Sequence, residues 1–260
     1  LRPVVVILRL AAHEHHAVDG GRAPQHLAAR HRNAAAAGAR VRLRLITPVD
    51  GHPNVLRLLR EADEQGPLFG SGWHSDWSFQ LKPPSATLLY AVDVPAAGGD
   101  TAFTSQYLAF ESLSESMKSI LLGLKGIHSA ERSYGPKGTF GRPDPNSSMD
   151  IHGDETAVVH QLHPLVRSHP LTGRRSLFVN EVYTVGIEGL TNSESSSLLK
   201  FLFEHCKQID FTCRVRWEPG TLTIWDNRAT QHFAINDYFG NRREMYRITL
   251  AGEQPVLASS

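Results

Sequence analysis

Two residues that could bind a metal ion stand two apart in the segment GSGWHSDWSFQ, residues 70–80. They are His74 and Asp76. Side chains at positions i and i+2 of an extended strand point to the same face, so both could reach one ion. The same spacing recurs at His152 and Asp154, but in a Gly-, Pro- and Ser-rich stretch where nothing predicts that alignment. A single His-x-Asp is common by chance, so the first pair needs a third ligand.

His232 is the candidate for that third ligand. It lies in TLTIWDNRATQHFAINDY, residues 221–238, after an alternating segment and the turn-forming DNR, so it could be presented at the end of a strand. Two histidines and one carboxylate on one face of an ion leave about three octahedral positions open, as in the facial triad of non-haem Fe(II) oxygenases. A zinc hydrolase with a metal-bound water could use the same three ligands.

An arginine pair follows the candidate triad. Arg243 and Arg247 stand four apart in NRREMYRITLAG, so on a strand they share a face, whereas Arg242 points away. A guanidinium keeps its charge and grips a carboxylate with two parallel hydrogen bonds, which suits the far carboxylate of a dicarboxylic keto acid. The alternative for such a pair is a solvated strand edge. A zinc hydrolase gives no reason for it.

The elements that must position these residues are mainly strands. Alternating and β-branched segments predict strands, capped amphipathic segments predict helices, and a Gly-, Pro-, Ser- and Asp-rich segment predicts a long loop. Strands are expected within residues 86–95, 176–187, 211–227 and 243–252, helices within 105–124 and 191–208, and the loop over 133–156. Residues 54–63 are too short a pattern to assign. The expected fold class is mainly β with flanking helices.

Residues 1–44 differ in composition from residues 45–260. They contain eleven alanines, five of the fourteen histidines and eight arginines against two acidic residues. The Arg- and Ala-rich composition fits a transit peptide or a divergent or misframed N-terminus, and we assign the functional domain to residues 45–260. The clustered His13, His15 and His16 are interpreted as a solvated segment.

The composition excludes several classes of protein. Of 260 residues, 41% are hydrophobic and 20% charged, which is typical of a soluble globular protein, and no apolar run approaches the roughly 18 residues of a membrane span. Residues 45–260 carry 19 basic and 24 acidic side chains, which argues against a nucleic-acid partner. Cys206 and Cys213 are too few for a disulfide framework, which favours a cytoplasmic protein with reduced thiols.

Several ordered segments resemble the taurine dioxygenase family of Fe(II)/2-oxoglutarate-dependent oxygenases, over about residues 46–254. They are WHSDWSF, PPSATLLYAVDVPAAGGDTAF, HPLVRSHPLTGRRSLFVNE, RVRWEPGTLTIWDNRATQHFAINDY and RREMYRITLAG. The resemblance implies a double-stranded β-helix, or jelly roll. It also implies an enzyme that uses Fe(II), 2-oxoglutarate and O2 to hydroxylate a small organic substrate, with succinate and CO2 as co-products.

Residue by residue, the resemblance implies iron ligands at His74, Asp76 and His232. It implies that Arg243, with the hydroxyl of Thr101, binds the distal carboxylate of 2-oxoglutarate. No catalytic residue is expected beyond this metal centre. Assembly into homo-oligomers is common in the family.

At the positions that contact the substrate in the family, this sequence matches at some and departs at others. Arg247 matches a position that holds the anionic group of the substrate, and Tyr183 matches an aromatic position of the pocket. Trp77 stands where a smaller residue is common, and Gly70 stands four before His74, near the place where taurine-using members have an asparagine. We therefore expect a small anionic, sulfonate-like substrate rather than taurine in particular.

Two further readings of the whole chain remain open. An inactive family member, damaged at its N-terminus or reduced to a jelly-roll binding module, would keep the scaffold without turnover. The presence of every expected ligand position argues against the binding module. A membrane partner is not expected.

Overall fold

The computed structural model of the protein describes residues 5–9, 48–142, 144–149, 151, 153 and 155–258. Fifteen strands lie in these ranges: β1 Val5–Arg9, β2 Pro48–Val49, β3 His52–Arg60, β4 Ala86–Asp93, β5 Thr101–Ser105, β6 Lys125–His128, β7 Gln161–Pro164, β8 Val166–Ser168, β9 Arg175–Leu177, β10 Thr184–Ile187, β11 Thr212–Val215, β12 Thr221–Asp226, β13 Thr230–Ala234, β14 Arg243–Leu250 and β15 Val256–Leu257. The α-helices are α1 Gln106–Glu111, α2 Glu115–Leu122, α3 Glu131–Tyr134 and α4 Asn192–Cys206, and 3-10 turns span Glu155–Val158 and Ile209–Phe211.

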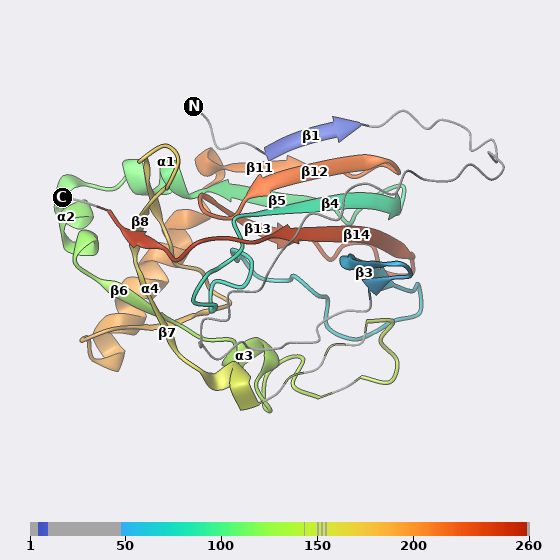
Figure 1. The fold of residues 1–260 in the computed structure, drawn as a ribbon, viewed down its shortest axis with the longest axis horizontal. Coiled ribbons are helices and arrows are strands. Elements are labelled where there is room, and N and C mark those ends of the chain that lie inside the picture. The colour runs from blue at the N-terminus through green and yellow to red at the C-terminus, as the bar shows by residue number, and fades with distance from the viewer. Residues whose placement is uncertain are drawn as a thin grey trace, which may run out of the picture.

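Two antiparallel sheets form the scaffold. The larger has the order β1-β12-β4-β14-β3-β2 and the smaller the order β11-β5-β13, so strands far apart in the chain become neighbours. In Figure 1 the long strands β12, β4 and β14 run alongside one another across the upper part of the molecule. Two further three-stranded sheets, β10-β6-β7 and β15-β8-β9, complete the described strands.

One apolar core joins the two scaffold sheets. Leu89 of β4, Trp225 of β12 and Met245 of β14 pack with Phe103 of β5 and Val215 of β11. Burial alternates along β4 and β12, so every second side chain points into this core, as a half-buried strand requires. The two sheets thus pack face to face as a double-stranded β-helix, which confirms the predicted fold class.

Helices α1, α2 and α4 gather at one end of the scaffold, beside the C-terminus, whereas α3 lies apart from them (Figure 1). A second apolar core lies there, between residues of α1, α2 and α4 and the strands β8 and β9. Helix α4 begins with a capping box: the Thr191 hydroxyl accepts from the Glu194 N–H, and the Glu194 carboxylate accepts from the Thr191 N–H. This cap satisfies backbone donors that the first turn leaves unpaired.

The structure corrects several boundaries expected from the sequence. The helix expected over 105–124 is divided at Ser112–Ser114 into α1 and α2, because Ser114 caps a new helix. The strand expected over 176–187 is reduced to the end of β9 and to β10. Most of residues 54–63, left unassigned, belongs to the nine-residue strand β3, which pairing with β14 stabilises despite an ambiguous pattern.

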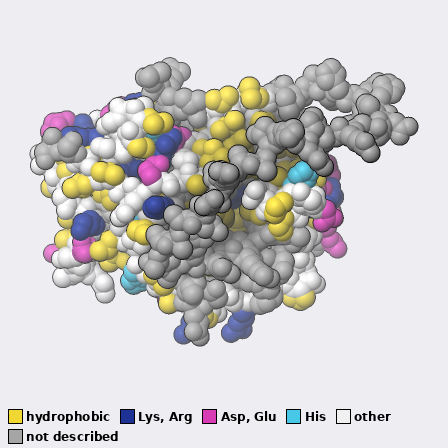
Figure 2. Space-filling model, viewed as in Figure 1, with side chains coloured by type: hydrophobic (Ala, Val, Ile, Leu, Met, Phe, Trp, Pro, Cys, Tyr) yellow, Lys and Arg dark blue, Asp and Glu magenta, His cyan; other side chains and the backbone are white. Residues whose placement is uncertain are grey.

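Residues 5–9 supply a strand that the sequence did not predict. Strand β1 pairs with β12 at the edge of the larger sheet, with Val6 opposite Ile224 and Leu8 opposite Leu222. Figure 2 shows hydrophobic side chains gathered over this part of the molecule, and the side chains of Val6, Ile7 and Leu8 are exposed. The domain boundary after residue 44 remains a prediction, and His13, His15 and His16 lie outside the described residues. In the part of the chain described, no helix is both long and apolar enough to cross a membrane.

Candidate metal centre

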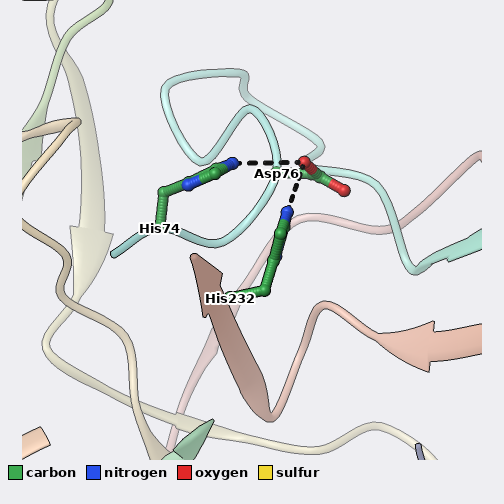
Figure 3. A group of neighbouring side chains, drawn as sticks. All are labelled: His74, Asp76 and His232. Atoms are coloured by element: carbon green, nitrogen blue, oxygen red, sulfur yellow. Dashed lines mark ion pairs between the residues drawn. The ribbon is translucent and has the colours of Figure 1, made fainter. Parts of the chain in front are cut away.

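Three buried side chains converge at one point of the scaffold: His74, Asp76 and His232 (Figure 3). The Nε2 atoms of His74 and His232 lie 3.8 Å and 3.6 Å from the same atom, Oδ1 of Asp76. One ligand atom from each residue falls within 4.8 Å of the others. Among the described residues this is the one group of histidine, cysteine and carboxylate side chains with such a spacing.

The backbone brings the two histidines together by a single β-bridge. The N–H of His74 donates to the His232 carbonyl at 3.1 Å, and the N–H of His232 donates to the His74 carbonyl at 2.8 Å. His232 belongs to β13, whereas residues 70–80 form turns, not the extended strand expected from the His-x-Asp spacing. Asp76 therefore reaches the ion site through the turn that follows His74. Its convergence with the histidines does not come from a shared strand face.

Hydrogen bonds orient the ligands. Nδ1–H of His74 donates to the Gly72 carbonyl at 2.8 Å, which leaves Nε2 of that ring as the free lone pair facing Asp76. Oδ2 of Asp76 accepts from the Thr87 hydroxyl at 2.6 Å, so Oδ1 is the oxygen left for the imidazoles. Nδ1 of His232 has no hydrogen-bond partner among the described residues.

The electrostatics favour the protonation states that bind a metal ion. Burial lowers the pKa of His74 and, more strongly, that of His232, because it disfavours the charged imidazolium. Burial acts in the opposite direction on Asp76. Arg247, the two imidazoles and the Thr87 hydroxyl outweigh it and hold the pKa of that carboxyl well below its usual value. Two neutral imidazoles and one carboxylate thus face one another at neutral pH.

Arg247 lies against this centre. Its Nη2 is 2.7 Å from Oδ1 of Asp76, and its Cζ lies 5.4 Å from the centroid of the Trp77 ring, within range of a cation–π contact. Trp77 has a φ of 43°, the one positive φ among the non-glycine residues described. Such a backbone conformation costs on the order of 1–3 kcal/mol, and residues that adopt it cluster at active sites and ligand-binding segments. The strained turn places the indole beside the guanidinium.

Arg243, the first residue of β14, lies close to Gly99, two residues before Thr101 begins β5. Gly99, with a φ of 72°, lets the chain pass close to the Arg243 side chain: a Cβ at Gly99 would meet its Nε at 3.4 Å. In the register of β5 with β13, Thr101 pairs with Ala234 and lies two residues from Phe103, the partner of His232. The Cζ of Arg243 lies 5.8 Å from the centroid of the Tyr238 ring. The Nε of Arg243 has no hydrogen-bond partner in the part of the chain described.

A hollow opens beside the triad on the side of Arg247. Its walls are largely aromatic: Phe69, Trp77, Tyr134, Phe140 and Tyr183. The Tyr183 ring meets the His74 ring edge-on with centroids 6.1 Å apart, and its hydroxyl is 3.5 Å from that of Tyr134. Burial raises the pKa of Tyr134 to about 12 and that of Tyr183 well above its usual value, so both phenols stay protonated.

Several residues of this site escaped the sequence analysis. Phe69, Tyr134 and Phe140 line the hollow, and Thr87 supports Asp76, yet none stands in a spacing that signals chemistry. Thr87 lies in a strand whose alternation predicted only burial. The second His-x-Asp, His152 and Asp154, lies outside the described residues.

The donor set fits the metal that the sequence predicts. Neutral imidazole and carboxylate oxygen are ligands suited to Fe(II), and two histidines with one carboxylate leave coordination positions for other molecules. The buried position of the three side chains keeps bulk water away, and the hydrogen bonds to Gly72 and Thr87 hold the ligand atoms in place. Their role as metal ligands remains a prediction from residue chemistry and geometry.

Comparison with known proteins reveals clear relatives. Residues 24–249 match the family described as "Taurine catabolism dioxygenase TauD, TfdA family". An α-ketoglutarate-dependent dioxygenase (cnsM) of Penicillium expansum is 39% identical over 71% of this chain and 50% of its own length. An α-ketoglutarate-dependent sulfate ester dioxygenase of Pseudomonas putida is 35% identical over 79% of this chain and 69% of its own length.

The fold of the chain also has solved counterparts. The crystal structure of a taurine dioxygenase from Burkholderia xenovorans superposes with a TM-score of 0.64 and 39% identity, covering 80% of this chain and 68% of that one. The chain spans about half the length of the Penicillium expansum relative.

Proposed function

The chain belongs to the taurine catabolism dioxygenase TauD, TfdA family, and on this basis we propose that it is an Fe(II)- and 2-oxoglutarate-dependent dioxygenase. Its reaction would convert a substrate C–H group, 2-oxoglutarate and O2 to the hydroxylated product, succinate and CO2. One observation carries the proposal: the Nε2 atoms of His74 and His232 both face Oδ1 of Asp76.

His74, Asp76 and His232 would hold the iron. When bound there, Fe(II) would supply the redox chemistry that couples the oxidative decarboxylation of 2-oxoglutarate to hydroxylation of the substrate. The protein itself supplies neutral imidazoles, an ionised carboxylate and a site shielded from bulk water. Positioning and exclusion of water are the main contributions of a protein to such chemistry.

Arg243 and Thr101 would bind the distal carboxylate of 2-oxoglutarate. Burial lowers the pKa of Arg243, and no carboxylate lies within ion-pair distance of it among the described residues. A buried cation without a counter-ion is costly, so a carboxylate ligand would stabilise it. The Thr101 hydroxyl accepts from Nε1–H of Trp217 at 3.0 Å, which leaves its own proton free to donate to the same carboxylate.

Arg247 would bind the anionic group of the substrate. It is the cation that lines the hollow beside the triad, and its guanidinium contacts the very oxygen of Asp76 that the imidazoles face. A metal ion bound to that oxygen would compete with Arg247 for it, which favours transfer of the guanidinium to an anionic substrate. The aromatic walls, including Trp77 and Tyr183, would then contact the organic part. This combination supports a sulfonate, a sulfate ester or a similar small anion.

The test is an anaerobic titration of the protein with Fe(II) and 2-oxoglutarate, followed by visible absorption. We expect a charge-transfer band in the wild type, its absence in His74→Ala, and its retention in His163→Asn, which changes a buried histidine outside the triad. Sulfonates, sulfate esters and aryloxy acids are then compared by the succinate they release. A wild-type protein without the band would contradict the proposal. Zinc-dependent hydrolysis without 2-oxoglutarate would favour a hydrolase.

A further inference from the structure

A chain of hydrogen bonds runs behind Asp76, on the side away from the two imidazoles. It begins at the Trp225 indole, passes through the Asn227 amide and the Thr87 hydroxyl, and ends at Oδ2 of Asp76. We propose that Thr87, Asn227 and Trp225 are positioning residues that make Asp76 a one-oxygen metal ligand. The inference rests on the metal centre proposed above and names residues that set its geometry.

We call this chain of hydrogen bonds from Trp225 to Asp76 the relay. The donor and acceptor of every hydrogen bond in it follow from its first member. Nε1–H of Trp225 can only donate, so the Asn227 atom that it contacts at 3.0 Å must be the oxygen. The amide nitrogen therefore faces Thr87 and donates to its Oγ1 at 2.9 Å. Because the hydroxyl oxygen accepts that bond, its single proton is directed to Oδ2 of Asp76, 2.6 Å away.

The sheet holds the relay in register. Thr87 lies directly opposite Trp225 in the pairing of β4 with β12. The N–H of Asn227 donates to the Ser85 carbonyl at 2.9 Å, and Oδ1 of Asn227 also accepts from the N–H of Asp76 at 3.3 Å. The turn that carries Asp76 is thereby tied to β4 through its side chain and to the residue that follows β12 through its backbone.

Burial makes the relay hard to replace. Thr87 is fully buried, and Asn227, Trp225 and Asp76 are each about 2% exposed, so water has little access to substitute for a lost partner. Without the Thr87 proton, Oδ2 would be a buried anionic acceptor with no partner, which is costly. The carboxylate would then rotate or bind a proton, and Oδ1 would no longer be held toward Nε2 of the two histidines.

The chain offers a matched control in the same sheet. Thr223 of β12 is also fully buried, but its hydroxyl has no hydrogen-bond partner among the described residues. At both positions, replacing threonine by valine exchanges the hydroxyl for a methyl group of similar size. Only the replacement at Thr87 removes a donor to Asp76.

The experiment measures Mn(II) affinity of the metal-free protein by the EPR signal of the free ion, with urea unfolding to check the fold. Thr87→Val should weaken Mn(II) binding by about 10- to 100-fold, the usual effect of losing an outer partner of a ligand. Thr87→Ser restores the donor and should bind like the wild type, and so should Thr223→Val. Trp225→Phe, which removes the donor that orients the relay, should weaken binding by a smaller factor.

Three results would overturn the inference. They are wild-type affinity in both Thr87→Val and Trp225→Phe, an equal loss in Thr223→Val, or no rescue by Thr87→Ser. If Thr87→Val does not fold, Trp225→Phe decides by itself, and wild-type affinity in that variant would refute the relay. A wild-type protein that binds no Mn(II) would instead refute the metal centre, and the inference with it. The two failures are therefore distinguishable.

Discussion

Two pairs of buried histidines lie in the part of the molecule that the structure describes, and one of the two resembles a metal site. The rings of His74 and His232, the metal pair, have centroids 4.2 Å apart, and those of His128 and His163, the support pair, 5.3 Å. Burial is the main cause that lowers the pKa in both pairs. The two pairs differ in whether a carboxylate lies beside them: Oδ1 of Asp76 lies within 4 Å of the Nε2 atoms of both rings of the metal pair.

The support pair has polar partners of another kind. Nδ1 of His128 shares a hydrogen bond with the Ser78 hydroxyl at 3.0 Å, and Nε2–H of His163 donates to the Gln80 carbonyl at 2.9 Å. Both rings pack against Phe178, and no carboxylate in the described ranges forms an ion pair with them. The support pair therefore fastens the segment after Asp76. Proximity and burial of two imidazoles are not enough for a metal site of this kind, which also requires a carboxylate that faces their nitrogens.

The largest expected effect on metal binding comes from removing the carboxylate beside the metal pair, which leaves that pair without an anionic neighbour, like the support pair. Asp76→Asn keeps the shape of the side chain and removes its charge. Mn(II) affinity should fall by more than the roughly 10- to 100-fold that loss of an outer partner causes, because a ligand itself is lost. Substrate-dependent succinate formation should disappear. His163→Asn, the matched change in the support pair, should retain Mn(II) binding, and its loss there would break the distinction between the pairs.

The support pair should contribute to the loss of stability in acid, as should the metal pair, whose pKa values burial also lowers. Burial lowers the pKa of His163 to about 4, whereas in the unfolded chain it is near 6.5. Between these values the unfolded state binds more protons, so stability is complete above pH 6.5 and declines as the pH falls toward 4. The loss from His163 should be about 2 kcal/mol, measured by urea unfolding of the metal-free protein at pH 7 and pH 4.5. His163→Gln should show a smaller decline; an unchanged decline would assign the effect to other groups.

The arginines sharpen the comparison on a smaller scale. Arg167, beside the support pair, is neutralised by Glu253 at 3.0 Å, whereas Arg243 has no such partner in the described part of the chain. Arg243→Gln should raise the 2-oxoglutarate concentration needed for half of the charge-transfer band by about 10- to 100-fold, since charged hydrogen bonds contribute about 1.5–3 kcal/mol. Arg242→Gln should change little, because that arginine contacts Glu61, Asp93 and Glu244. Equal effects in the two variants would refute the assignment.

Part of this site could be predicted from residue order alone. The sequence identified the candidate ligands from the motif WHSDW and the later His232, and the candidate carboxylate-binding residues from the spacing of Arg243 and Arg247. The structure places His74, Asp76 and His232 together. The i, i+4 rule also held for the arginines, with Arg242 turned toward Glu244 on the other face. Their chemical roles stay predictions that the experiments above test.

Other features depended on contacts that no local pattern reports. Asp76 reaches the histidines through a strained turn at Trp77, not through a strand, and β3 exists because β14 pairs with it. The relay joins Thr87 and Asn227, which are far apart in sequence and unremarkable in type. Periodicity tells which face of an element a side chain occupies, and residue type tells which chemistry it can perform. Strand pairing and burial across the whole sheet decide which atoms then meet, and which donors and acceptors are left without a hydrogen-bond partner.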